Sequence, residues 1–323
     1  MDIFVAGGAG FIGSHLVRRT LTDPQVERLT VYDNFSSGQR WHLAPVAPDP
    51  RLHVIEADLK DLPTLTQAMA GADVVYHFAS NPDIARALQQ PDIDFWEGTL
   101  LTQNVLEAMR VNRVSKLLYP SGSGVYGDVG DLPVAENYAP LQPISTYGAS
   151  KLACEALICA YCHMFELTAR AFRFANVVGP RQTHGVAFDF IRRLRQDSSR
   201  LRILGDGQQS KSYIYVDDVL DAMLWADSHS SERFDVFNVA ADDYLTVQEI
   251  ADLVVEEMGL QRRQVRYEFT GGTRGWKGDV PVVRFDLNKI HGLGWRAQRT
   301  SREAMRQAIR AMLMEIPYEP QAD

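Results

Sequence analysis

Tyr147 and Lys151 have the spacing of two residues that share one face of a helix. Leu152, Ala156 and Leu157 recur at helical spacing after them, so a helix is expected to carry the pair. A phenol is a poor base at neutral pH because its ordinary pKa is about 10, but a nearby ammonium group favours the phenolate. The pair could therefore remove a proton from a substrate hydroxyl group. The alternative is a solvated helix face, the usual case when this spacing occurs alone.

A glycine-rich turn near the N-terminus points to a nucleotide cofactor. It separates an apolar run at 3–6, typical of a buried parallel strand, from a segment at 11–17 with helical spacing. The glycines satisfy two overlapping patterns, and both place backbone NH groups at a helix N-terminus, where a pyrophosphate can bind. These glycines are Gly7, Gly8, Gly10 and Gly13.

Asp33 strengthens this interpretation. It ends a second predicted strand and lies 33 − 13 = 20 positions after Gly13, the spacing of a carboxylate that binds a ribose. Such a carboxylate accepts hydrogen bonds from ribose hydroxyl groups and repels a 2′-phosphate, so NAD is favoured over NADP. The alternative is a purely structural turn followed by a solvated Asp.

Further predicted strands at 52–55, 74–78 and 116–119 alternate with helical stretches. This alternation predicts an α/β fold with a doubly wound parallel (Rossmann) sheet. Ligands bind at the carboxyl ends of such strands, where the sequence places Asp58, Phe78, Ala79, Ser80, Ser121, Gly122 and Ser123.

The alternation loosens from about Gly179 onward, which predicts a second part with its boundary near Asn176. We expect a NAD-binding Rossmann domain at 1–175, completed by a later strand near 234–240. Residues 176–323 then form mainly a smaller C-terminal α/β lobe that binds substrate. Capping boxes predict two helices in this lobe, one beginning at Thr246 with Glu249 and one at Thr300 with Glu303.

Composition excludes several classes of protein. The 323 residues carry 33 basic and 41 acidic side chains, so the net charge of −8 argues against general nucleic-acid binding. No apolar run approaches the roughly 20 residues of a membrane span, and we expect no membrane segment. Cys154, Cys159 and Cys162 are odd in number and close together, which favours a reducing compartment, the cytoplasm.

The Cys159-x-x-Cys162 pair with His163 could form a redox or metal motif, but it lies within a predicted helix and lacks a second pair of ligands. Packing of the helix is the better explanation, and no metal site is expected.

Taken together, the motifs resemble those of the extended short-chain dehydrogenases/reductases, in the NAD-dependent epimerase/dehydratase family. Among these, the chain is most similar to the UDP-glucose 4-epimerases, and the similarity covers nearly its whole length. The motifs that carry it are the segments 7–15, 33–34, 125–127, 173–176, 204–207, 211–216 and 274–279, together with Tyr147 and Lys151.

This resemblance implies a reaction. Tyr147 would remove the proton of the sugar's 4-hydroxyl group, hydride would pass to tightly held NAD, and a 4-keto intermediate would rotate before hydride returned to its other face. Lys151 would also orient the cofactor's ribose. Asn176, Lys211 and Arg274 would meet the diphosphate or sugar of a UDP-sugar, and Asp279 would position the nucleotide. The helix after Lys151 would contribute to a homodimer.

The remaining candidate residues form two groups. Candidate cofactor contacts are Gly7, Gly10, Phe11, Ile12, Gly13, Asp33, Asn34, Ser37, Gly38, Asp58, Leu59, Phe78, Ala79, Ser80, Tyr147 and Lys151. Candidate substrate contacts are Ser121, Ser123, Asn176, Lys211, Arg274, Asp279 and Val283.

Two departures from the family pattern concern the catalytic segment. Gly122 stands where the family usually has a Ser or Thr, and Ser123 is our candidate for the missing hydroxyl group, directly or through a water. The segment 97–99 replaces an Asn-rich sequence.

Two further positions bear on reaction and substrate. Gly124 stands where dehydratase and decarboxylase relatives tend to have an acid, which favours epimerisation over elimination of water. Val283 stands where an aromatic residue often excludes N-acetylated sugars, which indicates room for UDP-N-acetylhexosamines.

The sequence therefore predicts a NAD-dependent UDP-sugar 4-epimerase. A nucleotide-sugar 4-ketoreductase or dehydratase of the same family is the nearest alternative. An alternative of another class is a non-catalytic NAD-sensing protein.

Overall fold

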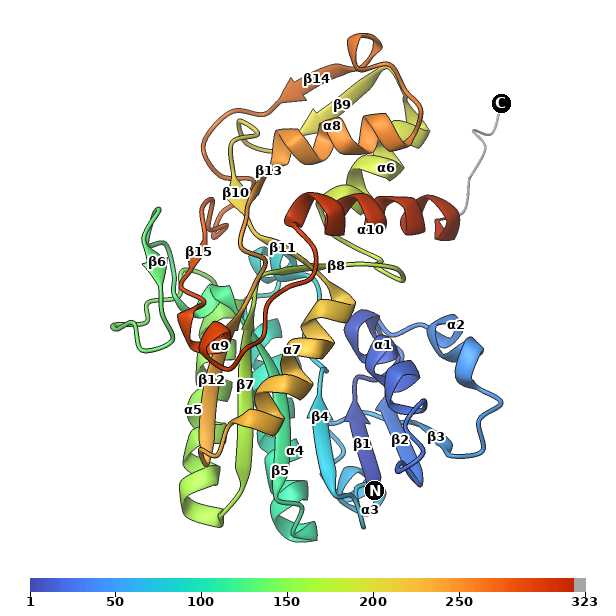
Figure 1. Cartoon of the computed structure of the whole chain (residues 1–323), viewed down its shortest axis with the longest axis vertical. Coiled ribbons are helices and arrows are strands. Elements are labelled where there is room, and N and C mark those ends of the chain that lie inside the picture. Colours follow the sequence, from blue (N-terminus) through green and yellow to red (C-terminus); the bar gives the residue numbers. More distant parts are fainter. Residues whose placement is uncertain (317–323) are drawn as a thin grey trace. The chain divides into compact units, whose positions relative to one another are not determined.

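The computed structural model describes residues 1–316, which divide into two compact units (Figure 1). Unit 1 comprises 1–127, 139–173 and 223–237, and unit 2 comprises 128–138, 174–222 and the chain from 238 onward. The functional limits that the sequence assigns to two domains, 1–175 and 176–323, stay a prediction.

Unit 1 is built on a seven-stranded sheet with the order β12-β7-β5-β4-β1-β2-β3. The pairings β1–β2, β1–β4, β2–β3 and β4–β5 are parallel, as expected for a doubly wound α/β sheet. The apolar residues of the first strand are buried, which explains its lack of polar alternation. The predicted Rossmann-type fold is confirmed. The strands are β1 Asp2–Ala6, β2 Arg28–Asp33, β3 Leu52–Glu56, β4 Val74–His77, β5 Lys116–Gly122, β7 Thr168–Phe174 and β12 Phe234–Val239.

Helices cover this sheet, and α3, α4 and α5 share one apolar core with it. Helix α5 begins where it does because the Ser145 side chain accepts a hydrogen bond from the Gly148 backbone NH at 3.1 Å. The helices are α1 Phe11–Thr20, α2 Arg40–Leu43, α3 Leu62–Ala68, the π-helix η3 Phe95–Thr99, α4 Leu100–Asn112 and α5 Thr146–Phe165, with short 3₁₀ turns at Ala44–Val46, Ile84–Leu88 and Ser123–Val125.

Unit 2 contains short strand pairs and three longer helices around its own apolar core. Both predicted capping boxes are present, and each helix starts directly after its capping Thr. The strands are β6 Pro133–Val134, β8 Asn176–Val178, β9 Arg200–Ile203, β10 Ser210–Lys211, β11 Tyr213–Tyr215, β13 Leu245–Thr246, β14 Arg266–Phe269 and β15 Arg284–Phe285. The helices are α6 Val186–Gln196, α8 Val247–Glu257, α9 Asn288–Gly292 and α10 Ser301–Glu315, with a 3₁₀ turn at Arg262–Gln264, while α7 Val216–His229 belongs to both units.

Within residues 1–316, the helices are all too short or too polar to cross a lipid bilayer.

Candidate active site

The glycine turn between β1 and α1 has the form of a phosphate-binding turn. Gly7 has φ +77°, and a Cβ there would lie 2.5 Å from the Ala79 nitrogen, so any side chain would collide with the loop after β4. A Cβ on Gly13 would lie 2.3 Å from the Gly7 oxygen. In the described part of the chain, no side chain caps α1. Its first NH groups can therefore bind an anion such as a pyrophosphate.

Asp33 lies at the end of β2, beside this turn. Its Oδ2 accepts a hydrogen bond from the Ala9 backbone NH at 2.9 Å, and its Oδ1 accepts one from Phe35 at 2.9 Å. Burial raises the pKa of the carboxyl group, although both hydrogen bonds act to lower it. A Cβ on Gly38 would lie 2.8 Å from Asp33 Oδ1, so the glycine permits this close approach. A carboxylate in this position suits a ribose, and the residues fit NAD.

The other candidate cofactor residues have varied surroundings. Asn34 Nδ2 donates to Asp58 Oδ2 at 3.1 Å, which joins the ends of β2 and β3. Leu59 belongs to the apolar core, so its backbone rather than its side chain is available. Phe11 and Ile12 are half-buried in α1 and Ser37 is exposed. The segment 78–80 follows β4, and Phe78 is held by a hydrogen bond to the Ala6 oxygen at 2.8 Å.

Tyr147 and Lys151 lie one turn apart in α5, and the Lys151 Nζ is 5.6 Å from the centre of the Tyr147 ring. The same nitrogen donates to the Pro120 oxygen of β5 at 2.8 Å and lies 4.8 Å from the Tyr119 ring centre. Burial lowers the pKa of Lys151 to about 8, against the opposing charges of Cys154, Glu155 and Asp94. The ammonium group is thus fixed between the catalytic candidate and the sheet.

The surroundings of Tyr147 differ from the expectation that a nearby ammonium group makes it a base. Burial raises the pKa of the phenol above its ordinary value, and the charge of Asp94 raises it further. A hydrogen bond from Ser80 acts in the opposite direction. Tyr147 is therefore a neutral phenol at neutral pH, and positive charge beside it would favour the phenolate.

The segment after Pro120 carries the predicted hydroxyl groups. Ser121 donates its hydroxyl to Glu155 Oε1 at 2.5 Å and is buried, so this group is already engaged. Gly122 is extended, and a Cβ there would meet no heavy atom of residues 1–316 within 4 Å. The Ser123 side chain is half-buried and makes no hydrogen bond within the described residues. Ser123 can therefore offer its hydroxyl to a ligand, and its catalytic role stays a prediction.

Glu155 and Arg173 form a buried ion pair that sequence reasoning missed. The Arg173 Nη2 and Nε donate to the two Glu155 oxygens at 2.7 and 3.0 Å, and Nη1 donates to the Tyr126 hydroxyl at 2.9 Å. Both charged side chains are at most 5% exposed. The available signal was Arg173 within the buried strand β7, because a charge in a buried strand requires a partner.

The π-helix η3 accounts for the unusual segment at 97–99. A Cβ on Gly98 would lie 2.4 Å from Ser150 Oγ, so Ser150 occupies the space that a side chain would need. The Thr99 and Ser150 hydroxyl groups are 3.0 Å apart. Glu97 forms an ion pair with Lys60 on the surface. The replacement of an Asn-rich sequence thus accompanies a close contact between η3 and α5.

Unit 2 brings three predicted substrate residues together. Lys211 Nζ lies 2.7 Å from Asp279 Oδ1, and Arg274 donates to the Asp279 backbone oxygen at 3.2 Å. Arg274 also pairs with Asp128 at 2.6 Å, a residue the sequence interpretation missed although it follows the motif at 125–127. Lys211 and Arg274 are both paired with oxygens of this cluster. On binding of a substrate, each cation could bind phosphate oxygens in place of these partners.

The other two substrate candidates in unit 2 are Asn176 on β8 and Val283, which directly precedes β15. Asn176 is exposed at the start of β8 and its side chain hydrogen-bonds to Tyr213 of β11. Val283 is 8% exposed, and its NH lies 3.4 Å from the Ser210 oxygen of β10.

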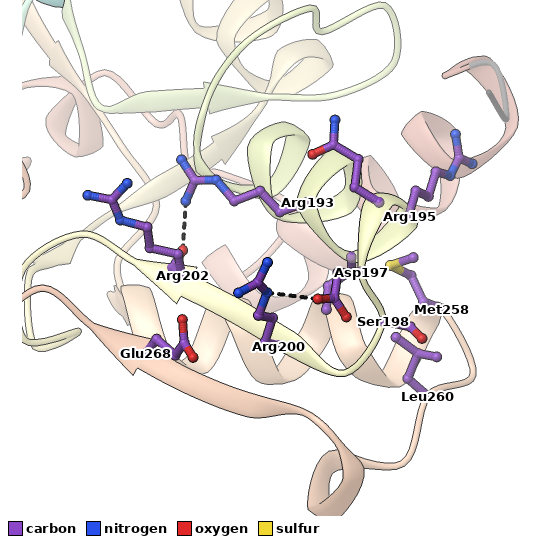
Figure 2. Close-up of a pocket in the computed structure, with 11 residues that line it drawn as sticks. Arg193, Arg195, Asp197, Ser198, Arg200, Arg202, Met258, Leu260 and Glu268 are labelled. Atoms are coloured by element: carbon purple, nitrogen blue, oxygen red, sulfur yellow. Dashed lines mark hydrogen bonds and ion pairs between the residues drawn. The ribbon is translucent and has the colours of Figure 1, made fainter. Parts of the chain in front are cut away.

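An open pocket of about 1050 Å³ lies elsewhere on unit 2, between α6 and β9 (Figure 2). Four arginines line it, but three donate to oxygens of the chain: Arg193 to Arg202, Arg195 to Leu313 and Ile316, and Arg200 to Asp197. None of the predicted site residues lines this pocket.

The three cysteines on α5 are free thiols. Within residues 1–316, no group of three or more His, Cys, Asp or Glu side chains is arranged to hold a metal ion.

Comparison with known proteins agrees with this geometry. The chain is 30% identical to a putative UDP-glucose 4-epimerase of Methanocaldococcus jannaschii over 316 residues, which cover 96% of this chain and 98% of the relative. A solved UDP-galactose 4-epimerase is similar with a TM-score of 0.85 and 37% identity, covering 98% of this chain and 100% of the other. The dTDP-glucose 4,6-dehydratase DesIV of Streptomyces venezuelae, solved with NAD bound, is similar with a TM-score of 0.88 and 27% identity over 98% of both chains.

The model of the NAD dependent epimerase/dehydratase family matches residues 3–240, about three quarters of the sequence. The chain therefore belongs to the NAD dependent epimerase/dehydratase family and is an enzyme that uses NAD.

Proposed function

We propose that this enzyme interconverts UDP-glucose and UDP-galactose by inverting carbon 4 of the sugar. The observation that carries the proposal is the pair Tyr147 and Lys151 on α5, in the same unit as the uncapped glycine turn. A base and a cofactor cradle together suit the removal of a proton and a hydride from one carbon. The relatives that are named as UDP-sugar 4-epimerases support the choice of substrate.

The cofactor residues act by position. When bound here, NAD would supply a hydride acceptor and donor for carbon 4 of the sugar. The glycine turn and the start of α1 hold its pyrophosphate, and Asp33 accepts hydrogen bonds from a ribose. The remaining candidate contacts are those that surround this turn and follow β2, β3 and β4.

The residues of α5 and the neighbouring loop move the proton. Tyr147 takes the proton of the 4-hydroxyl group and returns it after the keto sugar has rotated, so the net redox change is zero. The positive charge of Lys151 favours the phenolate during this step, and its position also suits the cofactor's ribose. Ser123 donates a hydrogen bond to the sugar oxygen. Ser121 fixes the loop in place through its hydrogen bond to Glu155.

In unit 2, Lys211 and Arg274 bind the diphosphate, and Asn176 donates an amide hydrogen to the diphosphate or sugar. Asp279 positions the nucleotide end.

A dehydratase is the alternative that the DesIV similarity favours. Elimination of water needs a further proton donor. Gly124 cannot supply one, and a Cβ there would lie 3.3 Å from the Gly148 Cα of α5, so an acid would require the loop to move. Gly124 therefore supports epimerisation.

The test is incubation of the purified enzyme with UDP-glucose. We expect UDP-galactose to form without accumulation of NADH. A ketoreductase would consume reduced cofactor in proportion to product, and a dehydratase would release a 4-keto-6-deoxy sugar. A NAD-sensing protein would give no product.

Val283 bears on a wider substrate range that includes UDP-N-acetylhexosamines. Because valine leaves more room than an aromatic residue, Val283→Tyr should lower turnover of UDP-N-acetylglucosamine relative to UDP-glucose. An unchanged ratio of the two rates would remove this residue from the account of specificity.

The enzyme is further proposed to be a cytoplasmic homodimer. Met164 and Phe165 on α5 and Val111 on α4 are exposed apolar side chains, 39–70% accessible, which suits contact between helices of two copies. The free thiols suit a reducing compartment. Size-exclusion chromatography that gave only monomer would contradict the dimer.

A further inference from the structure

Asp94 is a buried carboxylate that the proposed reaction does not use. It directly precedes the π-helix η3 and is 1% exposed. Its Oδ1 accepts a hydrogen bond from Asn81 at 2.8 Å and its Oδ2 accepts one from Thr146 at 2.6 Å. Its backbone oxygen accepts one from Ser150 at 2.7 Å. Each of these donors is neutral, so they satisfy the oxygens of Asp94 without cancelling its charge.

These contacts join two segments that are distant in sequence. Asn81 directly follows Ser80 in the loop after β4, and Thr146 directly precedes Tyr147 at the start of α5. Asn81 also braces its own loop, because its side chain donates to the Asp83 backbone oxygen and accepts from the Asp83 backbone NH, at 3.0 Å each. Asp94 therefore holds the residue next to Ser80 against the residue next to Tyr147.

The charge of Asp94 also reaches both members of the proposed catalytic pair. Burial is the largest cause of the raised pKa of Tyr147, and Asp94 is the next. For Lys151, burial lowers the pKa to about 8, while Cys154, Glu155 and Asp94 oppose the shift. A negative charge at this place stabilises an ammonium group and opposes a phenolate.

We propose that Asp94 is a positioning residue that fixes Tyr147 against the loop after β4 and keeps the pair as neutral phenol and ammonium until a positive charge binds beside it. The inference rests on the proposed function, because it assigns the pair its catalytic use. The π-helix suits this role, since such irregular turns often occur at functional sites.

Other titratable groups face the pair and stay in place in the variants considered below. They are Cys154 and Glu155 on α5, Tyr119 on β5 and His77 on β4.

The first experiment measures the titration of Tyr147 directly. The full-length enzyme with NAD bound is labelled with ¹³C-tyrosine, and the Tyr147 resonance is assigned by its loss in Tyr147→Phe. Asp94→Asn keeps the shape of the side chain and removes its charge, so we expect the pKa of Tyr147 to fall. The matched control is Asp92→Asn, which removes an exposed charge that accepts a hydrogen bond from Trp96, and we expect no change. An unchanged Tyr147 titration in Asp94→Asn would overturn the charge role.

The second experiment uses the pH dependence of kcat. In Asp94→Asn the rising limb of the kcat–pH profile should move to lower pH, because the Tyr147 phenolate forms at lower pH once the nearby negative charge is removed. A merely structural defect would lower kcat without moving the limb, and that result would contradict the proposal.

Thr146→Val tests positioning without changing the charge. It removes the hydrogen bond to Asp94, and kcat should fall about 10-fold, the size of a hydrogen bond to a charged group, with the limb unmoved and NAD affinity retained. Thr146→Ser should restore the rate, and wild-type kcat in Thr146→Val would overturn the positioning role. If the wild-type enzyme fails to interconvert UDP-glucose and UDP-galactose, the proposed function is wrong, while the Tyr147 titration still decides the charge role.

Discussion

Two buried carboxylates, Asp94 and Glu155, lie near the Tyr147–Lys151 pair, and they are satisfied in different ways. Glu155 accepts hydrogen bonds from Nε and Nη2 of Arg173 and from the Ser121 hydroxyl. Asp94 is bound by an amide and a hydroxyl group. Both are almost completely buried: Glu155 is 4% exposed and Asp94 is 1% exposed. One charge is therefore compensated by a cation in contact, and the other is not.

The difference separates a structural task from an electrostatic one. A buried ion pair is costly to break but has a small net charge, so Glu155 and Arg173 act mainly by holding the segment 121–126. A carboxylate with neutral donors keeps its full charge and affects titrating neighbours through a medium of low dielectric constant.

The largest effect is expected from breaking the ion pair. Glu155→Leu leaves the Arg173 charge buried without its partner, and we expect the free energy of unfolding to fall by about 3–5 kcal/mol. Asp94→Asn should cost only about 1 kcal/mol, since the amide oxygen can accept from Asn81 and the amide NH2 can donate to the Thr146 hydroxyl. Urea unfolding at pH 7 measures both values.

The double variant Glu155→Leu/Arg173→Met is the control for this loss. It removes both charges and should recover most of the stability. Loss of the exposed Lys60–Glu97 pair should lower the free energy of unfolding by less than about 1 kcal/mol. If Glu155→Leu lowers it by no more than this, Arg173 does not depend on Glu155 to compensate its charge.

A second effect follows from the lowered pKa of Lys151. Because the folded chain releases the lysine proton near pH 8 and the unfolded chain near 10.5, the unfolded state binds more protons between these values. Stability should therefore rise with pH across this window. Relative to Lys151→Met, which does not titrate, the wild-type chain should gain about 3 kcal/mol between pH 8 and 10.5.

Chemical denaturation at several pH values would measure this gain. In the Asp94→Asn background the window should begin at lower pH, because one of the charges that stabilise the ammonium group is absent. A difference between wild type and Lys151→Met that stays constant with pH would show that Lys151 does not titrate as described.

The smallest effect concerns the serines. Ser121→Ala removes one hydrogen bond to Glu155 and leaves the ion pair intact, so unfolding should become easier by only about 1 kcal/mol. Ser123→Ala should leave stability unchanged and lower turnover, because its hydroxyl is free for substrate. Full turnover in Ser123→Ala would remove this residue from the mechanism.

The residues differ in how well their roles could be inferred from the sequence. Glycine spacing, Asp33 and the capping boxes depend on local backbone geometry, which a sequence pattern records directly. The doubly wound parallel sheet followed from the alternation of strands and helices.

The missed residues depend on tertiary contacts. Asp94 meets Asn81 and Thr146 only after the chain has folded, and Glu155 meets Arg173 from another element. The raised pKa of Tyr147 likewise comes first from burial, which the Tyr147–Lys151 spacing does not reveal.

Tyr147→Phe tests the central claim most directly, because it removes one oxygen atom and little volume. We expect the interconversion of UDP-glucose and UDP-galactose to fall by about 10²–10⁴-fold, the usual contribution of a general base, while the variant still binds NAD. Interconversion at the wild-type rate would contradict the assignment of Tyr147 as the base.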